Sequence, residues 1–474
     1  MTDKFGIVIL AAGQGTRMKQ SVAKPLVPLQ GRRLVDYPLT EAFRFLQENK
    51  LSGKICLVTG HHHEHVESYI HEKYVDKKLH MVFQKEQKGT ADALKTYLQD
   101  CPWAKDVEYT LVLCADTPLL SSWVFESLLK ELILLKKDGV AATFYQENPT
   151  GYGRVVRAKK QSGFRIIEEK DAVGELSEIK KVQEVNSGVY LLKTQFILDH
   201  LYKVDNINKA GEFYLTDLFQ DELSVAPLYF SDPLSARLFL GINDLLQLEQ
   251  AGSYLKRRKM HELREFGVRF MDSSHTYIDQ TVSVGEGSLI YPNVIIEGDS
   301  IIGKNVVIEA GAIIKKCIIG DGAVIKAYCH LEESEVCTNA QIGPYARLRT
   351  GSHIGDDAKI GNFVETKKAI LHKGAKVSHL SYVGDAEIGE NSNLGCGFIT
   401  CNYDGANKHK TIIGRDTFIG SDSQMIAPVN IGNDCYVASG STINQDMEDG
   451  AFAIARARQL TKSGMAKKFL KSKK

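Results

Sequence analysis

The chain has 474 residues, which is more than one ordinary domain and suggests roughly two to four folding units. Hydrophobic residues make up 43% and charged residues 25% of the sequence, as is usual for a protein with a substantial core. The 59 Lys and Arg residues nearly balance the 58 Asp and Glu residues. This balance argues against a nucleic-acid coat or a membrane-surface protein, because both usually need a marked basic excess.

Targeting and membrane segments are not expected. No stretch approaches the roughly 18 uncharged apolar residues of a membrane span, and the short apolar run at the N-terminus leads straight into a glycine loop, unlike a signal peptide. The nine cysteines are scattered without a Cys-x-x-Cys pair, so we expect reduced thiols rather than a disulfide framework. These features predict a cytoplasmic protein that binds neither a membrane nor nucleic acid.

Short β-branched runs alternate with longer helical patterns in residues 1–242, the first predicted domain. The expected strands are residues 5–10, 55–59, 81–83, 110–114 and 141–145, and the expected helices include residues 34–49, 91–99 and 122–137. This alternation predicts a doubly wound, Rossmann-like α/β domain whose mostly parallel sheet is covered on both faces. Such sheets bind ligands at the carboxyl ends of their strands, so we expect the chemistry in the loops after Leu10 and Cys114.

Residues 243–272 form a predicted linker. Within it, residues 245–266 have apolar side chains near helical spacing and a basic cluster at 256–259, which favours one long polar helix. The pattern that follows is of a different kind, so this helix is expected to connect two domains.

Residues 273–474 contain aliphatic side chains that recur every six residues. These residues are Val284, Ile290, Ile296, Ile302, Ile308, Ile314, Ile342, Leu348, Ile354, Ile360, Ile413, Ile419, Met425, Ile431, Val437 and Ile443. Neither a helix nor a simple strand has a period of six. A parallel β-helix of hexapeptide repeats has this period, because each aliphatic residue points inward and the small residue that follows lies at a corner. We assign this half to the left-handed class of such β-helices.

The hexapeptide pattern breaks at residues 401–410, which are therefore expected to form a loop that extends outward from the coils. A coil of this kind buries apolar surface mainly against its own neighbours, so its flat faces favour self-association. By analogy with other hexapeptide β-helices, the protein is expected to be a homotrimer.

A glycine loop follows the first predicted strand, with the sequence Leu10-Ala-Ala-Gly-Gln-Gly-Thr-Arg-Met18. Gly13 and Gly15 let the backbone approach a phosphate or a base, neighbouring N–H groups can bind an anion, and Arg17 adds charge. A bare Gly-x-Gly is equally compatible with a tight strand–helix turn. The longer string, with Lys24-Pro25 beyond its Met, is much more specific.

This loop resembles that of the sugar-1-phosphate nucleotidyltransferases. Further stretches match the same group at residues 84–90, 113–119, 151–154, 168–171, 184–188 and 241–244. Together with the second half, their order and spacing resemble the bifunctional N-acetylglucosamine-1-phosphate uridyltransferase / glucosamine-1-phosphate acetyltransferase family over essentially the whole chain. Such an enzyme acetylates glucosamine-1-phosphate with acetyl-CoA and then transfers uridylate from UTP, releasing pyrophosphate.

The resemblance implies roles in the uridylyl half. Arg17 and Lys24 would neutralise the UTP phosphates and act in catalysis, and Asp116 with Asn243 would hold Mg²⁺. Uridylyl transfer relies on alignment and charge neutralisation, and Mg²⁺ takes few protein oxygens, which suits this set. The residues that would bind UTP and the UDP-N-acetylglucosamine product are Leu10, Ala11, Gly13, Gly15, Lys24, Gln84, Gly89, Thr90, Gly153, Glu168, Asn186 and Asn243.

The acetyl half needs a base that accepts a proton from the attacking amine, and histidine titrates near neutral pH. The resemblance assigns this role to His379, oriented by Glu365. The implied glucosamine-phosphate ligands are Arg349, Lys367, Tyr382 and Asn393. The implied acetyl-CoA contacts are Cys396, Asn402, Tyr403, Lys408, Ser421, Ser439 and Arg456.

Two departures from the family pattern concern the sites. Cys114-Ala115 precedes Asp116, the implied metal ligand, at the position where relatives usually carry Tyr-Gly or a similar pair. Because of this difference, the resemblance does not establish which sugar the site prefers. Cys396 stands where Ala is common, and it is a candidate for a thiol-sensitive position.

Two alternatives remain open. One is a monofunctional sugar-1-phosphate nucleotidyltransferase whose β-helix is structural or regulatory, and the other is a non-catalytic exchange-factor subunit with the same folds. The polar residues between Arg349 and Arg456 argue against the first, and the joint presence of the four uridylyl-site residues argues against the second.

Two further patterns are interpreted as surface features without a role in either reaction. The histidines at 61, 62, 63 and 65 are expected to form a solvated helix start rather than a metal site, because adjacent side chains diverge. The lysine-rich tail at 467–474 is expected to be a disordered arm. The alternative for this tail is a charged lid over the CoA phosphates.

Overall fold

The chain divides into two compact units, Met1–Leu255 and Lys256–Lys474. The computed structural model describes residues 4–13, 15–19, 21–77, 79–157, 163–172, 174–220 and 224–470. The boundary between the units lies inside one helix, α7 (Leu245–Glu265). Each unit has its own hydrophobic clusters.

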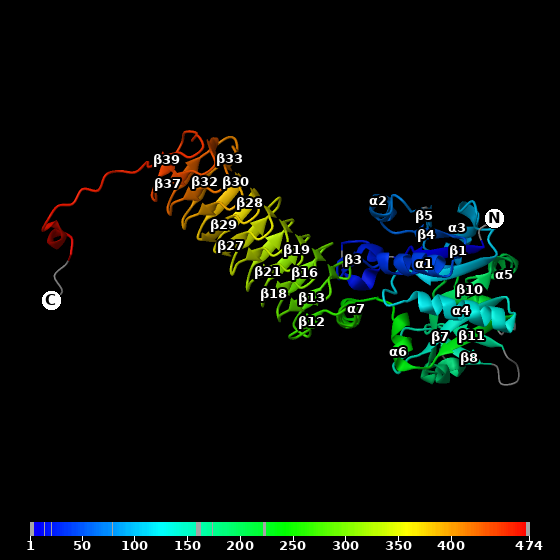
Figure 1. Ribbon diagram of the computed structural model, residues 1–474. Coiled ribbons are helices and arrows are strands. Elements are labelled where there is room, and N and C mark those ends of the chain that lie inside the picture. The colour runs from blue at the N-terminus through cyan, green and yellow to red at the C-terminus, as the bar shows by residue number, and fades with distance from the viewer. Residues whose placement is uncertain are drawn as a thin grey trace. The chain divides into compact units, whose positions relative to one another are not determined.

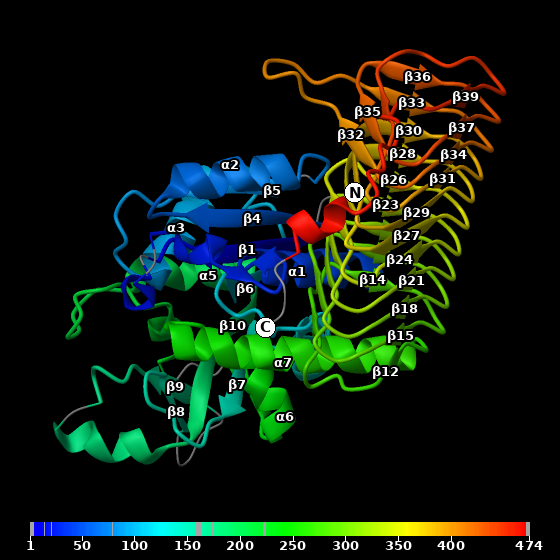
Figure 2. The same ribbon diagram turned by 90° about the vertical axis from the view of Figure 1, so that its left-hand side faces the viewer.

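A mixed nine-stranded sheet forms the centre of the first unit, and its main path runs β11-β7-β10-β6-β1-β4-β5. β1 pairs in parallel with β4 on one side and β6 on the other, and β5 pairs in parallel with β4 (Figure 2). The strands are β1 (Phe5–Ala11), β4 (Gly53–Thr59), β5 (Leu79–Phe83), β6 (Tyr109–Cys114), β7 (Gly139–Tyr145), β8 (Arg154–Arg157), β9 (Phe164–Ile167), β10 (Glu184–Lys193) and β11 (Val225–Phe230), with β2 (Pro28–Leu29) and β3 (Arg32–Arg33) as a separate pair.

Helices cover both faces of this sheet. In β1, Ile7 and Ile9 join a cluster with side chains of α1 and α4, whereas Val8 packs on the other face with side chains of α3. The helices are α1 (Asp36–Glu48), α2 (His63–Lys73), α3 (Thr90–Asp100), α4 (Ser122–Leu135), α5 (Thr194–His200) and α6 (Pro233–Ala236), with 3-10 turns η1 (Thr16–Met18), η2 (Lys24–Leu26), η3 (Gly174–Lys181), η4 (Leu201–Lys203), η5 (Leu215–Phe219) and η6 (Arg237–Phe239). The predicted α/β sheet with helices on both faces is confirmed. β10, which runs antiparallel to β6 and β7, was not expected.

The second unit is a parallel β-helix, whose coils stack into one column from β12 to β39 (Figure 1). One sheet contains β12 (Arg269–Phe270), β15 (Leu289–Ile290), β18 (Val307–Ile308), β21 (Val324–Ile325), β24 (Gln341–Ile342), β27 (Lys359–Asn362), β29 (Lys376–His379), β31 (Asn393–Leu394), β34 (Phe418–Ile419), β37 (Tyr436–Val437) and β39 (Phe452–Ala453). The hexapeptide architecture expected for this half is therefore confirmed.

The remaining strands of the β-helix share a second hydrogen-bonded sheet. They are β13 (Tyr277–Ile278), β14 (Ser283–Val284), β16 (Ile295–Glu297), β17 (Ile301–Ile302), β19 (Ile313–Lys315), β20 (Ile318–Ile319), β22 (His330–Glu332), β23 (Glu335–Val336), β25 (Arg347–Arg349), β26 (His353–Ile354), β28 (Glu365–Leu371), β30 (Tyr382–Ile388), β32 (Ile399–Cys401), β33 (Thr411–Ile413), β35 (Gln424–Ile426), β36 (Val429–Ile431) and β38 (Thr442–Ile443). A last 3-10 turn, η7 (Met465–Lys468), follows them.

The residues that repeat every six positions form the core of the β-helix. All the residues of the repeat that were identified in the sequence are buried. The stacking is not strictly periodic, because Ile308 pairs with Ile325, one residue earlier than a constant repeat would place its partner. Farther along, Ile388 pairs with Ile413, because a loop leaves the coil close to the predicted place. Cys401, the first residue of the predicted loop, still belongs to β32, so the loop begins after it.

Among the described residues, no helix combines the length and the apolar character needed to cross a membrane.

Candidate active sites

A cavity of about 590 Å³ opens in the first unit beside the carboxyl ends of β1 and β6. Nine of the residues assigned to the uridylyl half line it. They are Leu10, Ala11, Gly13, Lys24, Gln84, Gly89, Thr90, Asp116 and Glu168. The structure therefore brings together residues from six separate segments of the sequence, at the edge of the sheet where a ligand site was expected.

Lys24 lies at the centre of the most polar part of this cavity. Its ammonium contacts a carboxylate oxygen of Asp116 and lies 3.2 Å from the side-chain oxygen of Asn243. Asp116 follows β6 and Asn243 precedes α7, so the two predicted metal ligands come from distant parts of the chain. Their oxygens converge on one cation, which is the arrangement that a divalent metal also requires.

The glycine loop packs against the same lysine. Gly15 has a φ of +63°, and a Cβ atom there would come within 2.7 Å of the Lys24 Cβ, so the loop depends on glycine at this position. Arg17 is exposed on η1 and is not among the described residues that line the cavity. Its predicted contact with phosphate stays a prediction.

One end of the cavity is built around Gln84, which is almost fully buried. Its amide donates to Asp92 at 2.7 Å and to the carbonyl of Gly89 at 3.3 Å. Gly89, with a φ of +119°, leaves no room for a side chain because a Cβ would overlap the backbone of Phe213. Gln84 is thus held rigidly at the wall where the resemblance places the uracil.

The cavity is also lined by Glu168, whose carboxylate accepts a hydrogen bond from the Thr216 hydroxyl at 3.1 Å. Burial raises the pKa of this carboxyl above its usual value. Gly153 lies against Glu168, since a Cβ on this glycine would be 3.2 Å from a carboxylate oxygen. The Asn186 N–H donates to the Gly153 carbonyl at 2.9 Å, so the three residues assigned to the sugar lie together.

Some of the residues that line the cavity were not assigned from the sequence, and two of them, both polar, come from a segment without any motif. Glu212 and Tyr214 line the cavity from a segment that ends just before η5. The segment is held by backbone bonds from Phe213 to Lys88 and from Ala91 to Phe213. It has no periodic pattern, so nothing in the sequence alone marked it as part of the site.

Cys114 also lines the cavity, and burial raises the pKa of its thiol to about 12, with a further contribution from the Asp116 charge. The thiol is therefore protonated at neutral pH.

In the second unit, a column of charged side chains crosses two neighbouring coils. Arg349 donates to a Glu365 carboxylate oxygen at 2.8 Å and is the backbone neighbour of Lys367. The pKa of Lys367 is lowered, first by contact with the Lys408 ammonium and then by the charges of Lys408 and Arg349. Three cations thus gather at one place, and such a cluster favours an anionic ligand.

His379 is exposed at the end of β29, and its Nδ1 lies 2.7 Å from the side-chain oxygen of Asn362 on the preceding coil. Because that oxygen accepts, Nδ1 carries the hydrogen and Nε2 keeps a free lone pair. The expected orienting residue was Glu365, but in the structure Glu365 pairs with Arg349. The register explains the difference, since Asn362 aligns with His379 whereas Glu365 aligns with Tyr382.

The predicted loop holds Asn402, Tyr403 and Lys408. The Asn402 amide donates to the Asp385 carboxylate at 2.6 Å, and a backbone bridge joins Tyr403 to Lys408. Lys408 was assigned to acetyl-CoA, yet it lies against Lys367 of the sugar-phosphate set. Within the loop, hydrogen bonds from the Asn407 backbone and the His409 side chain lower the pKa of Asp404.

Four residues assigned to acetyl-CoA follow one corner of the last coils. The Asp422 N–H donates to the Cys396 carbonyl and the Gly440 N–H to the Ser421 carbonyl, which stacks Cys396, Ser421 and Ser439 on successive coils. Arg456 donates to the Ser439 carbonyl at 2.8 Å. Asn393 lies on a different sheet from Arg349 and Lys367, at the start of β31.

The histidines at 61, 62, 63 and 65 lie where α2 begins, and His63 stacks on Phe83 with ring centroids 3.9 Å apart. The four rings do not form a metal-binding group among the described residues. In the lysine-rich tail, residues 467–470 are exposed, and residues 471–474 lie outside the described part of the chain.

Models of known families match both units. A model described as nucleotidyl transferase matches residues 7–229, and one described as the GMPPB C-terminal domain matches residues 273–362. A model of six bacterial transferase hexapeptide repeats matches residues 410–445.

Several curated proteins are similar over nearly the whole chain. The bifunctional protein GlmU of Pelobacter propionicus is 41% identical over 471 residues, and the match covers 98% of each chain. The bifunctional protein GlmU of Geobacter sulfurreducens is also 41% identical, with 98% of each chain covered. That of Staphylococcus haemolyticus is 40% identical, covering 97% of this chain and 99% of the relative.

Proposed function

Because the chain belongs to the family of the bifunctional protein GlmU, we propose that it makes UDP-N-acetylglucosamine in two steps. The first step acetylates glucosamine-1-phosphate with acetyl-CoA, and the second transfers uridylate from UTP to the resulting N-acetylglucosamine-1-phosphate. The observation that carries the proposal is that each unit has its own set of converging polar side chains, one around Lys24 and one around Lys367.

The second step takes place in the cavity of the first unit. A phosphate oxygen of the sugar attacks the α-phosphorus of UTP, a new P–O bond forms, and the bond to the β-phosphate breaks to release pyrophosphate. Lys24 is placed to neutralise phosphate charge, and Arg17 is assigned the same task from the exposed turn next to it. Such a reaction depends on alignment and electrostatics rather than on a covalent enzyme intermediate.

The donor set fits Mg²⁺, which prefers a few oxygen ligands and keeps its other positions for water and phosphate. Asp116 and Asn243 would hold the ion, because their side-chain oxygens already approach one ammonium group. When bound, Mg²⁺ supplies charge neutralisation for the triphosphate.

Substrate recognition divides along the cavity. The uracil is proposed to bind against the wall that contains Gln84, Gly89 and Thr90. The glycine loop is proposed to contact the rest of the nucleotide. Gly153, Glu168 and Asn186 form the region proposed for the N-acetylglucosamine group. The Glu168 carboxyl, which already accepts from Thr216, is proposed to hydrogen-bond a sugar hydroxyl.

The first step takes place on the β-helix. The sugar amine attacks the thioester carbonyl, the C–N bond forms, the C–S bond breaks, and the amine proton passes to Nε2 of His379 as CoA leaves as a thiolate. Asn362 holds the imidazole in the tautomer that this role needs. Arg349, Lys367 and Lys408 provide the positive charge for the sugar phosphate, with Tyr382 and Asn393 assigned to the same substrate.

Acetyl-CoA is proposed to lie along the corner formed by Cys396, Ser421, Ser439 and Arg456, with Asn402 and Tyr403 near the acetyl group. We propose that the protein is a homotrimer and that three chains complete this site. The β-helix has an exposed stacked stripe of Tyr328, Tyr345 and Phe363, with centroids 5.3 Å and 5.5 Å apart, which is suited to contact with another copy. The substrates, UTP and acetyl-CoA, favour action in the cytoplasm.

Two assays on the purified full-length chain test the proposal. CoA release is followed with glucosamine-1-phosphate and acetyl-CoA, and pyrophosphate release is followed separately with N-acetylglucosamine-1-phosphate, UTP and Mg²⁺. Both activities are expected. Pyrophosphate release without CoA release would instead support a monofunctional nucleotidyltransferase with a structural β-helix.

A further inference from the structure

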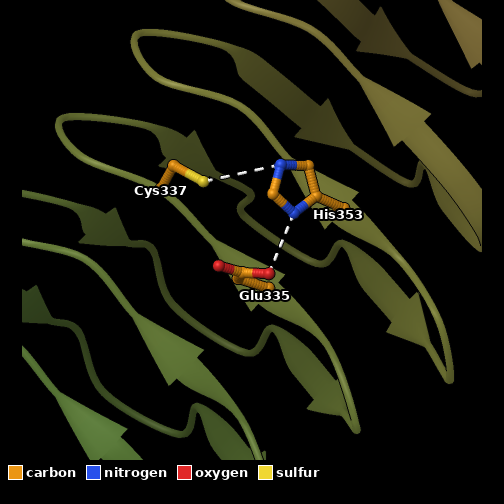
Figure 3. A group of neighbouring side chains, drawn as sticks. All are labelled: Glu335, Cys337 and His353. Atoms are coloured by element: carbon orange, nitrogen blue, oxygen red, sulfur yellow. Dashed lines mark hydrogen bonds and ion pairs between the residues drawn. The ribbon is translucent and has the colours of Figure 1, made fainter.

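Glu335, Cys337 and His353 form a compact group on the outside of the β-helix, and none of the three is assigned to either reaction. The side chains offer a carboxylate oxygen, a sulfur and an imidazole nitrogen, and these three ligand atoms lie within 4.8 Å of one another. Figure 3 shows the imidazole between the other two side chains, with one ring nitrogen facing the sulfur and the other facing the carboxylate. We propose that this group binds a divalent transition-metal ion of borderline softness, with Zn²⁺ as the best fit.

The backbone holds the three residues in place. Glu335 on β23 and His353 on β26 are direct partners in the sheet, and the residues that follow them, Val336 and Ile354, are buried in the core. The Cys337 N–H donates to the Ile354 carbonyl at 2.8 Å. A metal at this position would therefore bridge two successive coils on a rigid scaffold, which favours a defined coordination geometry.

Cys337 and His353 would supply the two side-chain atoms that bind the ion directly, and solvent would fill its other positions. The Cys337 sulfur lies 3.7 Å from Nε2 of His353. Two ligands at about 2.3 Å (sulfur) and 2.0–2.1 Å (nitrogen) in a tetrahedron are about 3.6 Å apart. A single ion can thus reach both atoms with little movement, and the thiol gives its proton to solvent when the ion binds.

Glu335 has the position of the carboxylate that commonly supports a metal-binding histidine. Its oxygen lies 3.0 Å from Nδ1 of His353, so Nδ1 carries the hydrogen and Nε2 keeps its lone pair toward Cys337. Asp356 on the next coil adds negative charge nearby. The carboxylates of Glu335 and Asp356 give this part of the surface a negative potential that attracts a cation.

Cys337 also occupies an unusual position in the coil. In the neighbouring coils the equivalent corner residue is glycine, at Gly303, Gly320 and Gly355, each donating its N–H in the same way. A Cβ at Gly320 would come within 2.8 Å of the backbone at Cys337, which explains the preference for glycine. His372 occupies the same corner two coils further on, so a side chain can be accommodated there, and Cys337 uses the position to place its sulfur beside His353.

The outward column that contains the pair is otherwise aliphatic on either side. Ile318 pairs with Glu335, and Ile370 pairs with His353. These isoleucines place apolar surface around the polar group, which strengthens electrostatic attraction to an ion.

Cobalt titration of the metal-free full-length protein tests the proposal, because Co²⁺ bound to a thiolate gives a near-ultraviolet charge-transfer band. The oxygen ligands Asp116 and Asn243 cannot give this band. We expect the wild type to reach saturation at one equivalent per chain and Zn²⁺ to remove the band by competition. Cys337→Gly, which restores the glycine of the neighbouring coils, should abolish it, and Glu335→Gln should weaken Co²⁺ binding by about 10–100-fold.

Three matched variants serve as comparisons. Cys396→Ser and Cys401→Ser each remove an exposed thiol outside the proposed site. His372→Gln alters a similar His–Glu pair, with Glu387, that is not part of a metal-binding group among the described residues. All three should keep the wild-type band. The proposal is overturned if the wild type shows no band, or if the band survives in Cys337→Gly and disappears in Cys396→Ser or Cys401→Ser. Circular dichroism of each variant confirms that the fold is retained.

Discussion

At the scale of single residues, the two proposed reactions require different electrostatics. The proposed uridylyl site must neutralise the charge of two polyanions, and Lys24, which contacts Asp116 and Asn243, is the lysine proposed for this. In the proposed acetyl site the imidazole of His379 is oriented by a neutral amide acceptor, Asn362.

His379→Gln is expected to lower kcat for acetyl transfer by about 10²–10⁴-fold, because the amine loses its proton acceptor. Pyrophosphate release from UTP should stay within about twofold of wild type, since the residue belongs to the other unit. CoA release and pyrophosphate release measured on one preparation check this. His330→Gln, on an exposed strand position, is the control and should change neither rate.

Asp116→Asn is expected to reduce pyrophosphate release by about 10²–10³-fold, since the charge that faces Lys24 and the proposed Mg²⁺ is removed. Acetyl transfer should be unaffected. Asp138→Asn, which breaks a surface pair with Lys193, is the matched control. Full uridylyl activity in the Asp116 variant would contradict the assigned metal ligand.

The stability of the first unit should depend on the protonation of Glu168. Because burial raises its pKa in the folded chain, the folded state binds more protons than the unfolded state, and stability falls as pH rises above about 4.3, the ordinary Glu value. Glu168→Gln stays neutral and should escape this loss. Its melting temperature relative to wild type should therefore increase with pH.

Melting curves between about pH 4 and pH 8 check this pH dependence of the Glu168→Gln variant. Glu178→Gln, at an exposed ion pair, should show no comparable trend. A difference between wild type and Glu168→Gln that does not vary with pH would argue against the buried carboxyl as its source.

Some residue-scale features could be predicted and others could not. Lys24, Asp116 and Asn243 were assigned from motif strings, and parallel strands bring loops to one edge, so their meeting follows from the fold class. The partner of His379 could not be predicted. It depends on the stacking register, which shifts wherever a coil is one residue short, as at the pairing of Ile308 with Ile325.

At the scale of elements, the corners of the β-helix constrain its sequence most tightly. Gly361 ends the buried strand segment of β27, and a Cβ at this position would overlap the carbonyl oxygen of Ser378 on the next coil. That oxygen belongs to the backbone and cannot move aside without disturbing the stacking. The corner therefore explains why glycine follows an aliphatic residue there.

Gly361→Ala is expected to destabilise the β-helix by about 1–3 kcal/mol through this overlap. Ile360→Val, one residue earlier and fully buried, removes a methylene without overlap and should cost about 0.5–1.5 kcal/mol. Thermal and denaturant unfolding of both variants give the comparison. A Gly361 variant as stable as wild type would show that the corner can relax.

Elements with strong periodicity were predicted and those without it were not. The first strands and the helices near residues 34–49 and 122–137 have uniform apolar patterns, and they appear as β1, α1 and α4. β10 was missed because Asn186, Ser187 and Gly188 interrupt its apolar pattern, and these residue types are rare in strands. Its burial comes from neighbours distant in sequence, which no local pattern reveals.

At the scale of the whole molecule, one chain carries two units with separate cores and separate polar sites. The proposed reactions are consecutive, since the acetylated sugar phosphate made by one unit is the substrate of the other. The β-helix carries the exposed aromatic stripe, and its acetyl-CoA site is proposed to be completed by three chains, so oligomer formation is expected to matter for acetyl transfer alone. A monomer in light scattering that still acetylated its substrate would contradict that expectation.

The most direct test of the two-step account is product analysis by mass spectrometry. Purified protein is incubated with glucosamine-1-phosphate, acetyl-CoA, UTP and Mg²⁺, and each component is omitted in turn. UDP-N-acetylglucosamine should form only in the complete mixture, and N-acetylglucosamine-1-phosphate should accumulate when UTP is left out. If the nucleotide sugar formed only from supplied N-acetylglucosamine-1-phosphate, the role of His379 and the acetyltransferase function of the β-helix would both be wrong.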